Sequence, residues 1–136
     1  MNEAAPSLWR VAVDCPLRTT LDYLPPADSS PATLQPGMRV RVPMGRREAV
    51  GLLVGPSTGS TVEASRLKAI RAPIDAEPLL DAALLELLLW TASYYHHPPG
   101  EVLFAALPAA LREGKPAAAE QDWLVVTPEG QAAFAA

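Results

Sequence analysis

The stretch Gln35-Pro36-Gly37-Met38-Arg39-Val40-Arg41-Val42-Pro43-Met44-Gly45 predicts the central element of the fold. Proline at the second and glycine at the third of its first four positions are typical of a type II turn. Apolar side chains then alternate with Arg39 and Arg41, which is the period-2 pattern of a strand with one apolar and one polar face. With a turn over 43–48 and a returning strand over 49–54, this stretch predicts a β-hairpin.

The flanking residues predict further short strands over 8–13, 21–24 and 67–72. Trp9, Val11 and Val13 alternate with their neighbours, as in a half-buried strand. Gly51, inside the returning strand, suggests a bulge or a tight bend. Short strands at this spacing favour a small, strongly curved β-barrel over residues 1–72.

Residues 73–114 change to a helical pattern and predict a helical part of the same domain. Asp81 can cap a helix that runs to about Tyr95 and ends before Pro98-Pro99. A shorter helix over 101–107 and a turn from Pro108 to Gly114 follow. The expected core stripe of the first helix consists of Leu84, Leu87 and Leu88, widened by Leu85 and Leu89.

Residues 115–136 predict a linker and the beginning of another domain. A strand is expected over 123–126, and Thr127-Pro128 is typical of a helix start, with threonine as the cap. The chain stops inside that helix, so we expect it to be a piece of a longer protein. The fold class predicted for the whole chain is α+β.

Composition and charge narrow the function. The 136 residues are 49% hydrophobic and 19% charged, which suits a folded protein. Net charge is −4, but residues 1–72 carry +3 (nine Lys/Arg, six Asp/Glu) and residues 73–136 carry −7 (two and nine), so nucleic-acid contact is expected on the first half. The lone Cys15 excludes an intrachain disulfide, and there is no secretory signal or long apolar run, so we expect a cytoplasmic protein without a membrane span.

The sequence lacks the patterns that carry catalysis. It contains no phosphate-binding Gly-x-x-x-x-Gly-Lys-Ser/Thr loop and no Gly-x-Gly-x-x-Gly after a strand. His96-His97 lack the spacing needed to chelate one metal. We therefore expect no catalytic residue, no metal site and no cofactor in this chain.

Five stretches, in order, resemble the PriA family of replication-restart helicases, also called primosomal protein N-prime. The resemblance covers roughly residues 8–117. The stretches are Val11-Ala12-Val13 leading to Leu21-Asp22-Tyr23-Leu24, then 36–45, Leu67-Lys68-Ala69, 88–103, and Leu107-Pro108 with Gly114-Lys115-Pro116.

The resemblance implies a module that binds the 3′ end of the nascent leading strand at stalled forks. The parent protein would be an ATP-dependent 3′→5′ helicase that initiates primosome assembly and uses ATP, Mg and zinc outside this chain. Residues 115–136 would lead into its winged-helix domain. The implied partners are forked DNA, the single-stranded DNA-binding protein and other primosome proteins, and the chain itself is expected to be a monomer.

The resemblance also implies a pocket for the terminal nucleotide, formed by Leu21, Asp22, Tyr23, Gly45 and Lys68. Asp22 can accept a hydrogen bond from a 3′-hydroxyl and repel a further phosphate. Tyr23 can stack on a base or be plain core, Gly45 permits close approach, and Lys68 can pair with a phosphate. Leu21 stands where the family usually has phenylalanine.

Other residues are candidates for wider contacts. Arg39, Arg41, Arg46 and Arg47 can contact the DNA backbone or form a solvated surface. Trp90 and Tyr94 are i,i+4 neighbours on the polar side of their helix, so they form a candidate partner surface unless they pack on the second helix. The alternative function is therefore a protein-docking module that contacts the helicase lobes or the acidic tail of the single-stranded DNA-binding protein. An RNA-binding barrel is a third possibility.

Overall fold

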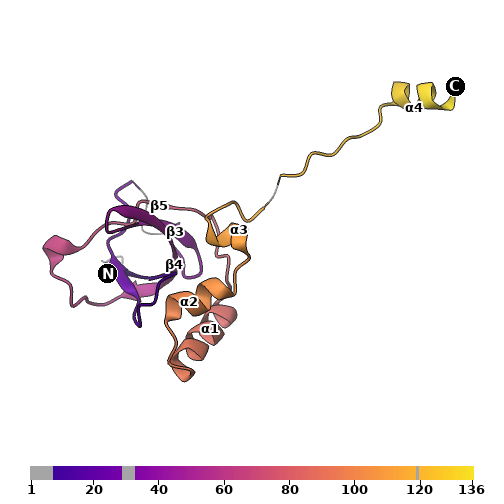
Figure 1. Ribbon diagram of the computed structural model, residues 1–136. Helices are drawn as coiled ribbons and strands as arrows, with labels where there is room; N and C mark the ends of the chain where they lie inside the picture. Colours follow the sequence, from indigo (N-terminus) through magenta and orange to yellow (C-terminus); the bar gives the residue numbers. More distant parts are fainter. Residues whose placement is uncertain (1–7, 29–32, 119) are drawn as a thin grey trace, which may run out of the picture.

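The computed structural model describes residues 8–28, 33–118 and 120–136, and it confirms the α+β class. A five-stranded antiparallel sheet has the order β2-β1-β4-β3-β5. Figure 1 shows the sheet curving round, with α1 and α2 on one side of it. Its strands are β1 (Leu8–Val13), β2 (Leu21–Tyr23), β3 (Arg39–Met44), β4 (Arg47–Ser57) and β5 (Ala72–Pro73). The helices are η2 (Ala64–Arg66, a 3-10 turn), α1 (Ala82–Tyr94), α2 (Pro99–Ala105), α3 (Ala109–Arg112) and α4 (Pro128–Ala135).

The predicted hairpin is confirmed and is tighter than expected. Its entry turn closes where the Met38 amide donates to the Gln35 carbonyl at 3.2 Å, with Gly37 at a φ of 91°. The last cross-strand pair is Met44 with Arg47, so only two residues form the tip. Gly45, the first of these two, has a φ of 63°, a conformation that glycine adopts without steric cost.

Gly51 is a point of close packing and not a bulge. A Cβ at Gly51 would come within 2.4 Å of Val11 Cγ1 on the neighbouring strand. The register shift of the sheet lies where Arg10 pairs with Gly55 and Val11 with Leu53, so Val54 is the extra residue. Gly51 therefore marks tight packing between β1 and β4, where we expected a bulge or a tight bend.

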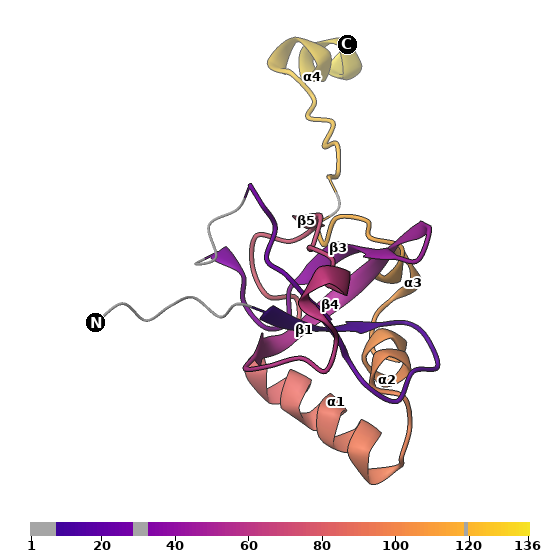
Figure 2. The ribbon, with the colours of Figure 1, turned by 90° about the vertical axis from the view of Figure 1, so that its left-hand side faces the viewer.

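The curved sheet buries apolar side chains on both faces. Its concave side holds a cluster that includes Val11, Val40, Val42 and Leu53. The other side carries Ala12, Leu52 and Val54, which pack against Leu85, Leu103, Phe104 and Leu107 of the helical part. Strand β1 is therefore buried on both faces and not half-buried, because α2 covers its outer side (Figure 2).

The hydrogen-bond ladder of the sheet is open, because its edge strands β2 and β5 do not pair with each other. Next to these edges, the Leu24 amide donates to the Lys68 carbonyl at 2.9 Å and the Ile70 amide donates to the Leu24 carbonyl at 2.9 Å. The strand predicted over 67–72 is therefore a single bridge at Ala69 followed by β5. The two edges are held near each other by this bridge.

Helix α1 begins as predicted but turns a different side to the core. The Asp81 carboxylate caps it by accepting from the Leu84 amide at 2.8 Å. Leu85 and Ala92 are buried, whereas Leu84 and Leu87 are 40% and 55% exposed. The predicted stripe was wrong at those two positions, since a helix with leucine on several sides has too little contrast to define one face.

Helix α2 lies against β1 at a distance that only glycine permits. A Cβ on Gly100 would lie 1.7 Å from the Val13 carbonyl oxygen, well inside contact distance. Gly100 itself is buried, and Leu103 and Phe104 of the same helix are almost completely buried. The absence of a side chain at Gly100 thus lets the helical part approach the sheet closely.

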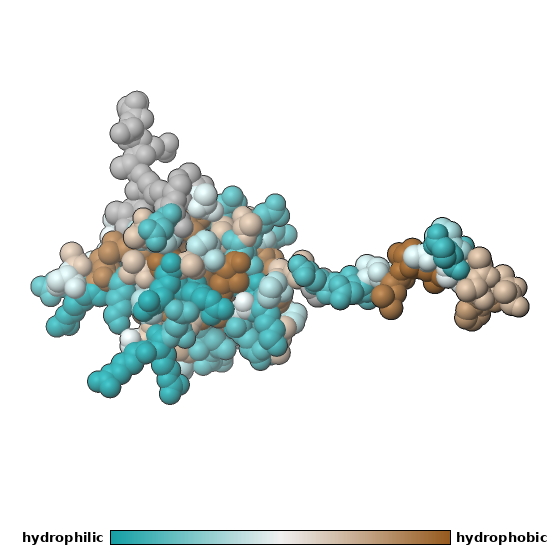
Figure 3. Space-filling view, turned by 90° about the horizontal axis from the view of Figure 1, so that it is seen from above, coloured by the Kyte–Doolittle hydropathy of each residue, from teal (hydrophilic) through white to brown (hydrophobic). Residues whose placement is uncertain are grey.

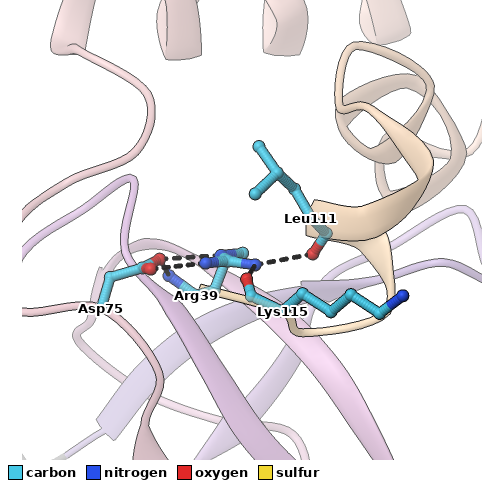
Figure 4. A network of polar contacts seen from close by, with 4 residues as sticks. All are labelled: Arg39, Asp75, Leu111 and Lys115. Carbon is cyan, nitrogen blue, oxygen red and sulfur yellow. Dashed lines mark hydrogen bonds and ion pairs between the residues drawn. The ribbon is translucent and has the colours of Figure 1, made fainter. Parts of the chain in front are cut away.

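Arg39 is the largest fully buried side chain, with 0% exposure. Its amide and Nε donate to Asp75 Oδ2 at 3.0 and 2.9 Å, and its Nη2 donates to Asp75 Oδ1 at 2.6 Å. Its Nη1 donates to the carbonyls of Leu111 and Lys115, each at 2.8 Å (Figure 4). The predictions of a DNA contact or a solvated arginine are both wrong at this position. The alternation placed Arg39 opposite the apolar face correctly, but it could not show that α3 covers that side.

The C-terminal part differs from the prediction in one element. Residues 123–126 form no strand, and Trp123, Leu124 and Val125 are largely exposed. Figure 3 shows apolar side chains on this extended segment before α4. The predicted helix start is confirmed, because Thr127 Oγ1 accepts from the Gly130 amide at 3.2 Å. Within the described ranges, no helix combines the length and apolar character needed to cross a bilayer.

The buried ion pair makes a stability prediction. Asp75→Ala leaves the Arg39 guanidinium buried without its counter-charge, and we expect a loss of about 3–5 kcal/mol in the free energy of unfolding, measured by urea denaturation. Glu48→Ala is the control, because this carboxylate pairs with arginines at the surface and its loss should cost less than about 1 kcal/mol. Equal losses of unfolding free energy in the two variants would show that Asp75 does not balance a buried charge.

Candidate nucleic-acid interface

The five residues implied by the resemblance line one hollow of about 230 Å³. They come from β2, from the tip of the β3–β4 hairpin and from the segment after η2, which are distant in sequence. The hollow is lined by Leu21, Asp22, Tyr23, Gly45 and Lys68, together with Met44, Val62, Arg66 and Leu67. The last four were missed by the sequence analysis.

Strand β2 sends its side chains alternately inward and outward. Leu21 and Tyr23 pack on the apolar cluster inside the curved sheet. Asp22 lies on the opposite side, half-buried, and is paired across the strands with Arg10. The carboxylate therefore faces the outer, solvent-accessible part of the hollow.

Tyr23 is a core residue that also lines the hollow. It is 5% exposed, and its hydroxyl donates to the Pro43 carbonyl at 2.8 Å. Burial raises the pKa of the Tyr23 phenol above 10.0, and the nearby Cys15 raises it further. The reading of Tyr23 as a core residue is confirmed, and its stacking on a base stays a prediction. The phenol ties β2 to the β3–β4 hairpin.

Lys68 and Gly45 meet at the edge of the hollow. Lys68 Nζ donates to the Gly45 carbonyl at 3.3 Å, and both residues are exposed. A Cβ at Gly45 would find open space, so glycine is required there for its positive φ and not for room. Lys68 and Arg66 bring two positive charges to the rim of a hollow that also contains the Asp22 carboxylate.

The remaining arginines around the hairpin are exposed and in part already paired. Arg41 Nη1 lies 3.7 Å from Glu48 Oε1, and Arg71 Nε lies 3.3 Å from Glu48 Oε2. Arg46 and Arg47 are exposed at and beside the hairpin tip, close in sequence to Gly45. These four guanidinium groups can reach a nucleic-acid backbone that passes the hairpin.

Trp90 and Tyr94 form a second candidate surface. Their rings stack with centroids 4.9 Å apart, and they are 56% and 62% exposed. The alternative that they pack on the second helix is therefore wrong. Trp90 borders a groove of about 810 Å³ whose lining includes Leu85, Asp81 and Glu86.

The described residues contain no group of three or more His, Cys, Asp or Glu side chains that could hold a metal ion. His97 Nε2 lies 2.9 Å from Glu101 Oε2 one helical turn away. The chemistry on offer is thus a hollow with an acidic group, basic groups at its rim and an apolar floor. Such a site suits one unit of a phosphate-linked polymer.

Comparison with known proteins assigns this curved sheet, helical part and hollow to a class of DNA-binding domain. A family model for the 3′ DNA-binding domain (3′BD) of PriA matches residues 10–108. The chain belongs to this PriA family.

Curated relatives match over most of the chain. The chain is 44% identical over 108 residues to the replication restart protein PriA of Haemophilus influenzae, covering 79% of this chain and 14% of that protein. It is 29% identical over 102 residues to the replication restart protein PriA of Buchnera aphidicola subsp. Acyrthosiphon pisum, covering 75% and 14%. The chain thus spans about one seventh of the length of these relatives.

The buried phenol makes a pH-dependent prediction. Above pH 10.0 the unfolded chain loses the Tyr23 proton while the folded chain keeps it, so stability falls as pH rises through this range. Tyr23→Phe removes this contribution, and its free energy of unfolding should fall less steeply than that of wild type between about pH 9 and about pH 11. At neutral pH the variant should lose about 0.5–1.5 kcal/mol, because the Pro43 carbonyl loses its donor.

Urea unfolding at several pH values measures both effects. Tyr95→Phe is the matched control, since Tyr95 is exposed at the end of α1 and its loss should leave the wild-type slope unchanged. A wild-type slope in Tyr23→Phe would show that the phenol does not titrate as expected.

Proposed function

We propose that the hollow binds the terminal nucleotide of a DNA 3′ end, within a protein that restarts replication at stalled forks. The observation that carries this proposal is the convergence of Asp22, Lys68 and Gly45 on one hollow of about 230 Å³, in a chain of the PriA 3′ DNA-binding family. This volume lies below the roughly 300–1,000 Å³ of usual small-molecule sites, which suits a single unit at the end of a strand.

The charges of the hollow can distinguish an end from a continuous strand. Asp22 can accept a hydrogen bond from a free 3′-hydroxyl, and its charge repels the phosphate that would follow in a continuous strand. Lys68 and Arg66 can pair with the phosphate on the 5′ side of the terminal nucleotide. The carboxylate thus favours the 3′-hydroxyl side of a terminal nucleotide, and the two positive charges favour its 5′-phosphate side.

The base would be held by apolar contact and not by stacking on tyrosine. Leu21, Met44, Val62 and Leu67 supply aliphatic walls to the hollow, while the Tyr23 ring is buried below it. Aliphatic walls tolerate any base, so we propose that the hydroxyl and phosphate contribute more to recognition than the identity of the base does.

Properties of the parent protein extend the proposal. Residues 115–136 would lead into a winged-helix domain, and the bridge at Leu24 would complete a barrel-like closure of the sheet. ATP, Mg and zinc would serve helicase activity elsewhere in the parent. We propose forked DNA, the single-stranded DNA-binding protein and other primosome proteins as partners, a monomeric chain and a cytoplasmic location.

Terminal recognition makes a direct prediction about DNA ends. A short oligonucleotide with a 3′-hydroxyl should bind at least about tenfold more tightly than one with a 3′-phosphate, because Asp22 repels the added charge. Asp22→Asn should reduce this preference to near unity. Fluorescence anisotropy at fixed salt measures both affinities.

Asp14→Asn is the control for this experiment, since Asp14 is an exposed aspartate that does not line the hollow. It should keep the wild-type preference. Equal binding of the two oligonucleotides to the wild-type protein would refute end recognition.

Docking of another protein is a second candidate function, favoured by the exposed pair Trp90 and Tyr94 beside the groove. We propose the helicase lobes of the parent as the occupant ahead of the acidic tail of the single-stranded DNA-binding protein. Asp81 and Glu86 line the same groove, and like charges there would repel an acidic tail.

The docking proposal predicts that attachment to the helicase lobes can be lost while DNA binding is kept. In the full-length protein, Trp90→Ala should weaken attachment of the domain to the helicase lobes and raise its protease sensitivity, while 3′-end affinity of the isolated domain stays within about twofold. Leu124→Ala, which removes an exposed apolar side chain elsewhere, is the control. If Trp90→Ala did not change the protease sensitivity of the domain, the docking proposal would be contradicted.

A further inference from the structure

A second hollow, of about 480 Å³, adjoins the terminal-nucleotide hollow. The two share Gly45 and Lys68 as a common wall. On its other sides the second hollow is lined by Asp28, Pro43 and Arg71 among others. It is larger than the first hollow, so a second nucleotide has room there.

The common wall places a positive charge at the boundary between the two hollows. Lys68 Nζ is held there by the Gly45 carbonyl at 3.3 Å, and its side chain remains exposed. In a single strand, a phosphodiester group lies between each pair of successive nucleosides. A lysine at the boundary of two adjacent hollows is therefore where a strand that occupies both would bring its linking phosphate.

We propose that the second hollow binds the penultimate nucleotide of the same strand, so that the domain reads a 3′-terminal dinucleotide. Lys68 pairs with the phosphodiester that links the two nucleotides, and Arg71 pairs with the next phosphate on the 5′ side. This inference rests on the proposed function of the first hollow and adds a second subsite to it.

Arg71 is positioned for this role. Its amide donates to the Arg41 carbonyl at 2.8 Å, which fixes its backbone against β3, while its side chain is 62% exposed. Its Nε lies 3.3 Å from Glu48 Oε2, so the guanidinium is held beside the hairpin before DNA arrives. A phosphate can share or replace that carboxylate, since a guanidinium has donors on two edges.

The rest of the second hollow favours one orientation of the strand. Asp28 is an acidic group that disfavours phosphate and can accept hydrogen bonds from base amino groups. Ile70 is buried, and the Pro43 carbonyl already accepts from Tyr23, so this part of the lining is held in place. The base is thus directed toward Asp28 and the phosphates toward Lys68 and Arg71.

The test compares ligands that fill one hollow or both. NMR titration of the isotope-labelled protein would measure the affinity for a deoxynucleoside 5′-monophosphate and for a 5′-phosphorylated dinucleotide, both with a free 3′-hydroxyl. We expect the dinucleotide to bind about tenfold more tightly, an additional 1.4 kcal/mol. Arg71→Gln should remove most of that gain and have a much smaller effect on the affinity for the monophosphate, whereas Arg71→Lys should restore part of the gain.

Arg112→Gln is the matched control, because Arg112 is exposed on α3 and lines neither hollow. Retention of the full gain in Arg71→Gln, or no gain in the wild-type protein, would overturn the second subsite. Asp22→Asn tests the first hollow separately, because it should weaken both ligands. If Asp22→Asn weakened neither, the terminal site itself would fail, whatever the result for Arg71.

Discussion

The buried guanidinium of Arg39 connects the parts of this domain. A charge with no exposure to water must find all its partners inside the protein, and here they come from two separate segments. Asp75 supplies two carboxylate oxygens from the chain that leads to α1, and Leu111 and Lys115 supply carbonyls from the end of α3. The guanidinium therefore links the sheet to the segment before α1 and to the end of α3.

The candidate site depends on a second interaction, the hydrogen bond that the Tyr23 hydroxyl donates to the Pro43 carbonyl. Tyr23 faces inward, and its hydroxyl bonds to the hairpin that carries Gly45. Its neighbour Asp22 faces outward into the hollow. A residue expected to stack on DNA thus acts as a positioning residue, because it sets how the β2 carboxylate lies relative to the hairpin tip.

Features of the fold that depend on neighbouring residues were predictable from the sequence. The hairpin, the Asp81 cap and the Thr127 cap each depend on residues within four positions of one another. What failed depends on distant packing: the exposed leucines of α1, the coverage of Arg39 by α3, and the absence of a strand over 123–126. A periodic pattern identifies two faces of an element, but it does not say what covers each face.

Five residues of the site were found through the family resemblance, and no local spacing would have brought 21–23, 45 and 68 together. The lining residues that were missed include Val62 and Leu67, isolated apolar residues in an otherwise polar segment. Such apolar residues in a polar segment could have marked these two positions from the sequence.

The bonds that Arg39 makes to the carbonyls of Leu111 and Lys115 also limit how far α4 can lie from the sheet. They fix the Lys115 carbonyl beside β3, and by chain length alone the twelve residues from 116 to 127 can carry α4 at most about 40 Å from that point. Helix α4 is therefore confined to that radius, at a raised effective concentration beside the candidate hollow.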